Sequence, residues 1–164
     1  MSSSSSSPLR TQVHDDGTLE VADGDGVAWF FVDVVDGHSA SFGVYVGAAS
    51  GAMFDASIHL SQQALTTSTT PVTFFCDALY VRRYDSAFRE RWVKWFLAHR
   101  RRVDVMHFAI PQQGLLRMGL QMVGMALPAF VDTLDDDTGL DAVLGVHRPA
   151  FLRLRARRDA WRKK

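Results

Sequence analysis

The segment 71–102 constrains the fold of this chain most, because it combines a buried strand with an amphipathic helix. Its first part, 72–76, is a continuous run of apolar and β-branched residues, which is typical of a strand covered on at least one face. The run ends at Asp77. Eight residues later, Asp85 and Ser86 stand where a helix requires an oxygen to accept its free N–H groups. The pattern predicts a strand that ends at Asp77, a loop, and a helix that begins at Ser86.

The remaining chain alternates strand-like and helix-like segments in the same way. A turn at 23–26 separates two short apolar runs, which predicts a hairpin. The expected strands are 19–22, 27–32, 41–46, 72–76, 103–110 and 129–133, and the expected helices are 53–65, 86–101, 111–127 and 136–144. Strands that alternate with helices pair in parallel through right-handed crossovers. We therefore expect an α/β fold with a mixed, mostly parallel sheet of about five or six strands, helices packed on it and an antiparallel N-terminal hairpin.

Composition predicts one domain with a polar segment at each end. The 164 residues are 47% hydrophobic, which suffices for one core. Residues 1–17 are a serine tract followed by turn formers, and we expect them to be a disordered tail. The domain is expected over 18–146, followed by a basic amphipathic tail over 147–164. The single cysteine, Cys76, has no partner for an internal disulfide, and no apolar run is long enough to span a membrane, so we expect a cytoplasmic protein.

In element order and in one motif, the region 19–144 resembles the STAS-like family, which has the fold of bacterial anti-sigma factor antagonists. It resembles especially the divergent relatives in this family that are near the CRAL-TRIO lipid-binding fold. In that family a strand ending in Asp is followed by a loop and by Asp-Ser-Ser/Ala-Gly at the start of a helix, and a partner kinase phosphorylates the Ser. Asp77 and Asp85-Ser86-Ala87 match this spacing, and Phe88 stands at the position of the Gly. The resemblance implies a non-enzymatic protein-interaction module in a bacterial regulatory or assembly complex, switched at Ser86.

The physical chemistry of Ser86 allows two interpretations. A phosphate there would face free N–H groups and the positive end of the helix dipole, and Arg82, Arg83 and Arg89 are close enough in sequence to pair with it. Alternatively, Asp85 or Ser86 is only a helix cap, which stabilises by about 1 kcal/mol.

The predicted helix 111–127 is apolar around most of its circumference. Met118, Met122 and Met125 form one stripe, and leucines form a second. Such a helix is either deeply buried or presents an adaptable surface to another protein, a second copy of the chain or a lipid. Both interpretations remain open at this point.

The charge of the chain is unevenly distributed. Residues 1–77 contain nine acidic residues and one arginine, whereas residues 148–164 contain eight basic residues and one aspartate. The basic segment is either a solvated tail, or docks onto the acidic cluster at 132–141 or another copy, or contacts nucleic acid or a membrane surface. Its candidate contact residues are Arg153, Arg155, Arg157, Arg158, Trp161 and Arg162.

No pattern in the sequence indicates catalysis. The six histidines and the single cysteine lack the spacing of a metal site, and no glycine-rich phosphate loop is present, so we expect no enzyme activity, no metal and no cofactor. Two further functions remain as alternatives to the interaction module. One is a binder of a lipid or another apolar molecule, and the other is a structural protein that self-associates through its acidic front and basic tail.

Overall fold

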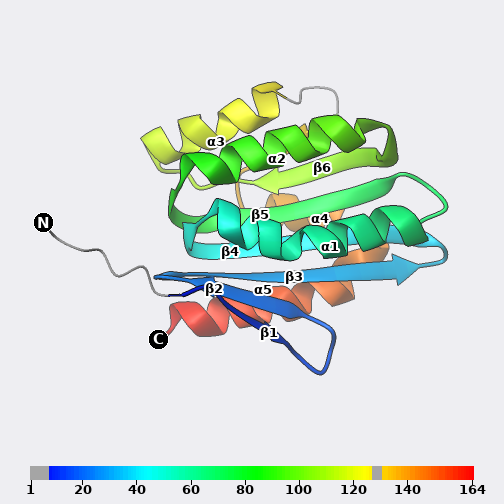
Figure 1. The fold of residues 1–164 in the computed structure, drawn as a ribbon, viewed down its shortest axis with the longest axis horizontal. Helices are drawn as coiled ribbons and strands as arrows, with labels where there is room; N and C mark the ends of the chain where they lie inside the picture. The colour runs from blue at the N-terminus through cyan, green and yellow to red at the C-terminus, as the bar shows by residue number, and fades with distance from the viewer. Residues whose placement is uncertain (1–7, 127–130) are drawn as a thin grey trace, which may run out of the picture.

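The computed structural model describes residues 8–126 and 131–164 (Figure 1). Seven strands form one sheet in which the order of the strands follows the sequence. The strands are β1 (Arg10–Val13), β2 (Leu19–Asp23), β3 (Gly26–Val35), β4 (His38–Ala49), β5 (Val72–Tyr84), β6 (Val103–Ala109) and β7 (Val131–Leu134). The helices are α1 (Gly51–Thr67), α2 (Ser86–His99), α3 (Gly114–Ala126), α4 (Asp137–Val143) and α5 (Arg148–Arg162), with 3-10 turns η1 (Arg100–Arg102) and η2 (Gly145–His147).

The sheet is half antiparallel and half parallel. Strands β1 to β4 form an antiparallel meander, and β4 to β7 pair in parallel through the crossover helices α1, α2 and α3. This arrangement confirms the predicted α/β class with an antiparallel N-terminal part. The sheet has seven strands where we expected five or six, because β1 adds one more antiparallel pairing.

Strand β1 lies inside the segment that we expected to be disordered. Arg10 to Val13 pair with Ala22 to Leu19, so the free backbone groups at the edge of β2 find partners. All four side chains of β1 are exposed, which explains why the sequence shows no hydrophobic pattern there. The expectation of disorder is therefore wrong for this strand, and residues 1–7 lie outside the described residues.

Strand β5 is longer than predicted. We expected it to end at Asp77, but it continues to Tyr84, because its second half pairs with β4 up to the contact between Ala49 and Tyr84. Asp77 consequently lies in the middle of a central strand, fully buried. The predicted loop between Asp77 and Asp85 is sheet, and α2 begins directly at the carboxyl edge of β5.

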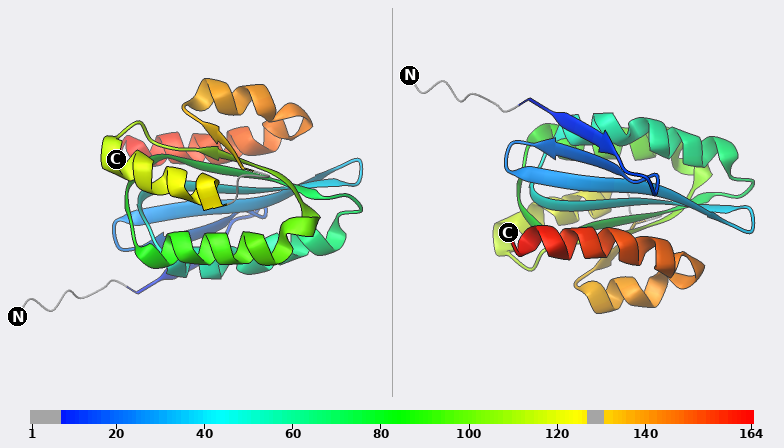
Figure 2. Two further views of the ribbon diagram at one scale, coloured as in Figure 1. Left: turned by 90° about the horizontal axis from the view of Figure 1, so that it is seen from above. Right: turned by 90° about the horizontal axis from the view of Figure 1, so that it is seen from below.

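Helices cover both faces of the sheet (Figure 2). Helices α1, α2 and α3 cover one face, where Phe74, Trp92 and Phe108 belong to a large apolar core. Helices α4 and α5 cover the other face, where Phe42 and Phe151 belong to a second core. Within the segment 147–164, Arg148–Arg162 form a docked helix and not a solvated tail, and Arg155 on this helix pairs with Asp137 and Asp141, so docking onto the acidic cluster is the alternative that the structure supports.

Two helix ends differ from the prediction. The third crossover helix begins at Gly114 and not at Pro111, because the chain stays extended after β6 and Ile110 N–H donates to Leu134 O at 3.0 Å. Helix α2 ends at His99, and a 3-10 turn leads into β6.

Candidate functional site

Asp85 joins two helices at the carboxyl edge of the parallel strands. Its Oδ1 accepts a hydrogen bond from Phe88 N at 2.7 Å, which makes Asp85 the N-cap of α2. The same oxygen accepts from Gly51 N at 3.0 Å, the first residue of α1. Asp85 N–H donates to Ala49 O at 3.1 Å. The capping interpretation of Asp85 is therefore correct, and this carboxylate fixes the starts of α1 and α2 relative to each other.

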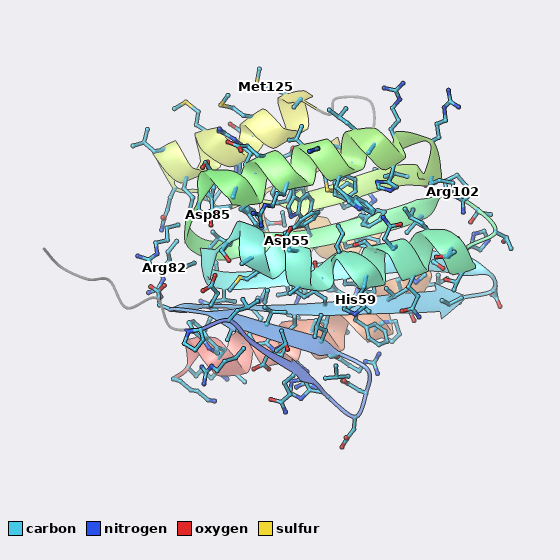
Figure 3. The ribbon with its side chains drawn as sticks, viewed as in Figure 1. Asp55, His59, Arg82, Asp85, Arg102 and Met125 are labelled. Atoms are coloured by element: carbon cyan, nitrogen blue, oxygen red, sulfur yellow. The ribbon has the colours of Figure 1, made fainter. Side chains whose placement is uncertain are left out.

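Ser86 is the first residue of α2 and is exposed, so a second protein could reach its hydroxyl. Among the arginines expected to surround it, Arg83 pairs with Asp25 at 2.6 Å, Arg82 is exposed and Arg89 is partly buried. Arg82 and Asp85 lie at the same end of the sheet (Figure 3). The site thus combines an accessible hydroxyl with a helix N-terminus, which favours a negative charge such as that of a phosphate.

Phe88, which stands at the position of the glycine in the family motif, points into the core. Its side chain is fully buried, with its ring centroid 5.1 Å from that of Tyr45 and 6.3 Å from that of Tyr84. The large side chain therefore does not occupy the outer surface beside Ser86.

Helix α3 carries an exposed apolar surface. We define the α3 surface as Leu115, Met118, Met122 and Met125, whose residues are 83%, 57%, 52% and 77% exposed. Met125 points away from the sheet in Figure 3. The methionine stripe that the sequence predicts is thus at the surface, and the burial interpretation does not apply to it.

The inner side of α3 is held against the sheet. Leu120 is fully buried and Leu116 packs partly against the same core. A Cβ atom on Gly119 would lie 1.9 Å from Tyr84 Oη, so this glycine allows α3 to approach the end of β5. Tyr84 lies two residues before Ser86, and it therefore links α3 to the start of α2.

The candidate contact residues of the basic segment already interact within the chain. Carboxylates engage three of the five arginines, whereas Arg153 and Arg162 lie over aromatic rings and are exposed, so only these two have donors available for an outside anion. Arg153 lies over Phe31, Arg155 pairs with Asp137 and Asp141, Arg157 pairs with Asp16, Arg158 pairs with Asp77, Asp137 and Asp159, Trp161 packs against the second core, and Arg162 lies over Tyr80.

Arg158 anchors α5 through a buried ion pair. Its residue is 1% exposed, and its Nη1 donates to Asp77 Oδ2 at 2.6 Å and to Asp137 Oδ1 at 2.8 Å. Burial raises the pKa of the Asp77 carboxyl, and Arg158 opposes this shift. The hydrogen bond from Arg158 lowers the pKa of Asp137. Burial alone would lower the pKa of Arg158, but hydrogen bonds and charges from Asp137 and its other partners raise it above its ordinary value. The arginine is therefore charged and fully paired.

The sequence carries a signal for the burial of Arg158. Phe151, Leu154, Arg158 and Trp161 recur at spacings of three and four, so Arg158 occupies a core position of an amphipathic helix. An arginine at such a position requires a buried carboxylate, and Asp77 at the end of an apolar run was the natural candidate.

The described residues provide no metal site and no activated thiol. Within 8–126 and 131–164, no cluster of three or more His, Cys, Asp and Glu side chains could hold a metal ion. Cys76 is buried, and burial together with the charge of Asp77 raises the pKa of its thiol. None of the helices in this part of the chain has the length and hydropathy needed to cross a membrane.

The core beneath α1 and α2 is closely packed. A cavity between these helices and the sheet, lined by Phe30, Phe54 and Phe74 among others, has a volume of about 20 Å³. This volume holds about one water molecule and not an acyl chain.

No model of a known protein family and no curated protein matches the sequence. Among solved structures, the fold is similar to that of an uncharacterized protein from the DUF3478 family with a SpoIIAA-like fold, from Shewanella loihica PV-4. The two chains are 15% identical, and the match covers 71% of this chain and 93% of that chain, with a TM-score of 0.53. The match confirms the resemblance at the level of the fold. The chain therefore has a SpoIIAA-like fold, which is the α/β fold of the STAS-like proteins.

Proposed function

We propose that this chain is a non-enzymatic protein-interaction module that acts in a bacterial cytoplasmic regulatory or assembly complex. The observation that carries the proposal is the α3 surface. Soluble proteins seldom expose four large apolar side chains on one helix, and such patches mark sites where another molecule binds. Methionine side chains are flexible and polarisable, so they adapt to the shape of a partner.

The composition of α3 favours a protein over a membrane as the partner. Helices that lie on anionic membranes carry lysines and arginines beside their apolar face. Helix α3 carries one basic residue, Arg117, and its guanidinium pairs with Asp135. The apolar surface therefore lacks the free cations on its own helix that membrane binding requires.

Ser86 is the proposed switch of this module. A phosphate there would lie beside the Asp85 carboxylate and weaken by repulsion the cap that joins α1 to α2. Arg82, Arg83 and Arg89 would compensate part of that repulsion. Because Tyr84 also contacts α3, a shift at the start of α2 would change the presentation of the α3 surface.

The structure gives less support to the two alternative functions. An apolar ligand enclosed in the core beneath α1 and α2 would need a cavity larger than the one-water space found there. Self-association between the acidic residues of 1–77 and the basic helix α5 of another copy would need free cations on α5. Three of these cations, Arg155, Arg157 and Arg158, are paired with carboxylates of their own chain.

Quantitative affinity purification from the native host tests the proposal. The baits are the intact chain, a Met118→Ser/Met122→Ser variant, and a His59→Ser variant, which changes an exposed residue of α1. We expect at least one protein to decrease about tenfold with the methionine variant and to remain with the His59 control. Ser86→Asp, compared with Ser86→Ala, should alter the recovery of the same protein. Identical protein sets from the intact chain and the methionine variant would contradict the proposal.

A further inference from the structure

An open cavity lies at the carboxyl edge of the parallel strands, on the face covered by α5. Its volume is about 300 Å³, which falls at the lower end of small-molecule sites. The second half of β5, the loop between β6 and α3, and the last turn of α5 enclose it. Ligands of open α/β sheets bind at this edge, where the crossover connections leave the strands. Neither Ser86 nor a residue of the α3 surface lines the cavity, and Arg82 is the one residue that it shares with the proposed switch.

The lining of the cavity combines an apolar floor with a cationic rim. Val46 and Val81 are buried beneath it, and Trp161 provides a half-buried indole ring. Arg82 and Arg162 line it as exposed cations. None of the described lining residues is acidic. A cavity of this kind matches a ligand with a negative group at one end and an apolar or planar group at the other.

The wall formed by α5 is held in place before any ligand arrives. Arg162 Cζ lies 3.5 Å from the centroid of the Tyr80 ring, and Arg158 Cζ lies 4.8 Å from the same centroid. Arg158 is fixed in turn by its ion pair with the buried Asp77. The nearest described carboxylate to Arg162 is that of Asp159, at 3.8 Å, which is too long for a hydrogen bond. The Arg162 guanidinium is therefore oriented and retains donors for an anion.

We propose that this cavity binds a small organic anion. Its carboxylate or phosphate group pairs with Arg82 and Arg162, and its planar part packs against Trp161. Such a ligand would bridge β5 and α5, so its binding would also stabilise the docking of α5. This proposal goes beyond the interaction module and does not depend on the α3 surface.

Isothermal titration calorimetry of the full chain with defined probes tests the proposal. The probes are 1-naphthoate and phenyl phosphate, and 1-naphthamide serves as the uncharged analogue of the first. We expect saturable binding of both anions in the millimolar range or tighter, weaker at high salt, and at least about tenfold weaker binding of the amide. The absence of saturable binding by either anion, or equal binding of the amide, would overturn the proposal.

Matched variants locate the site. We expect Arg162→Gln and Arg82→Gln each to weaken the binding of both anions about tenfold, as expected for the loss of one charged contact. Arg148→Gln, at the opposite end of α5, is the control and should leave the affinity unchanged. Circular dichroism and the melting temperature verify that each variant folds. A control that weakens binding as much as Arg162→Gln would contradict the assignment, because it would show a general charge effect.

Discussion

Helices α3 and α5 differ from what their compositions suggest, because the apolar helix α3 has an exposed side and the arginine-rich helix α5 has a buried one. Helix α3 has one charged residue, yet it exposes Leu115, Met118, Met122 and Met125. Helix α5 has six arginines, yet it packs against β3 and β4 and buries Arg158 completely. The apolar helix therefore exposes large apolar side chains, and the charged helix is part of the framework.

The difference shows that the available neighbours, and not composition, decide how each helix is used. Helix α3 packs against α2 and β7, and no other described helix lies on its far side in Figure 1. One half of its apolar circumference thus remains without a partner. Helix α5 lies across β3 and β4, and three carboxylates are in place to receive Arg158. A buried arginine is tolerated where its charge is fully paired.

Removing the charge of Arg158 should have the largest effect on stability. We expect Arg158→Met to lower the free energy of unfolding by about 3–5 kcal/mol, because the buried Asp77 carboxylate loses its partner. The pKa of Asp77, which burial already raises, should then rise further. A carboxyl whose pKa is raised in the folded state favours folding when it is protonated. The loss of unfolding free energy in Arg158→Met should therefore be smallest at acid pH and grow as the pH rises toward the folded pKa of Asp77.

Urea denaturation at several pH values measures this effect. The double variant Asp77→Asn/Arg158→Met should be destabilised by less than the sum of the two single changes, because no unpaired charge remains. An Arg158→Met protein within about 1 kcal/mol of the parent at neutral pH would show that α5 is not anchored in this way.

Truncating the inner face of α3 should have the next largest effect. Leu120 is fully buried, so Leu120→Ala should lower the free energy of unfolding by about 3 kcal/mol. Leu115→Ala on the exposed side of the same helix is the matched control, with an expected change within about 0.5 kcal/mol. Chemical denaturation compares the two, and equal losses would indicate that the two sides of α3 do not differ.

A smaller effect is expected where α5 meets the turn between β1 and β2. Asp16 accepts from Thr18 N at 3.0 Å and pairs with Arg157 at 3.2 Å. Burial alone would raise the pKa of Asp16, but the contacts with Thr18 and Arg157 outweigh it and lower the pKa to about 2. Because this folded pKa lies below the unfolded value of about 3.8, the stabilisation is present above pH 4 and disappears as the pH falls toward 2.

Asp16→Asn should therefore cost about 1 kcal/mol at neutral pH. The difference between parent and variant should shrink below pH 4 in thermal melts recorded along a pH series. A constant difference down to pH 2 would argue against the assigned pKa.

The smallest effect on stability is expected for the α3 surface itself. Met118→Ser/Met122→Ser should leave the free energy of unfolding within about 0.5 kcal/mol of the parent, because both side chains are exposed. The same variant should bind less of a hydrophobic dye at equal protein concentration. A large loss of stability would mean that these methionines belong to the core.

The parts of the fold with hydrophobic periodicity were predictable. The continuous run 72–76 correctly predicted a buried strand, and Asp85 was predicted as a cap because an acidic side chain preceded an amphipathic helix. Strand β1 was not predictable in this way, because its exposed side chains contribute no pattern and its stability comes from backbone pairing with β2.

The residues of the candidate surfaces could be named from the sequence, but their exposure and their contact partners could not. The methionine stripe of α3 was visible, but a helix that is apolar on all sides does not reveal which side faces the sheet. The sequence left the role of α5 open between a solvated tail and a docked segment, because its six arginines indicated solvent exposure, whereas the spacing of Phe151, Leu154 and Arg158 indicated burial. The helical spacing places Arg158 at a core position, but no local pattern identifies its partner Asp77, which lies 81 residues away in the sequence.

Photo-crosslinking in the native host can decide between the roles assigned to the two helices. A benzophenone amino acid is placed at Met122 on the outer side of α3 and, in a separate protein, at Leu152 on the exposed side of α5. We predict a discrete crosslinked partner from position 122 and none from position 152. Crosslinks from position 152 alone, or equally from both positions, would contradict the assignment of α3 as the contact surface and α5 as the framework.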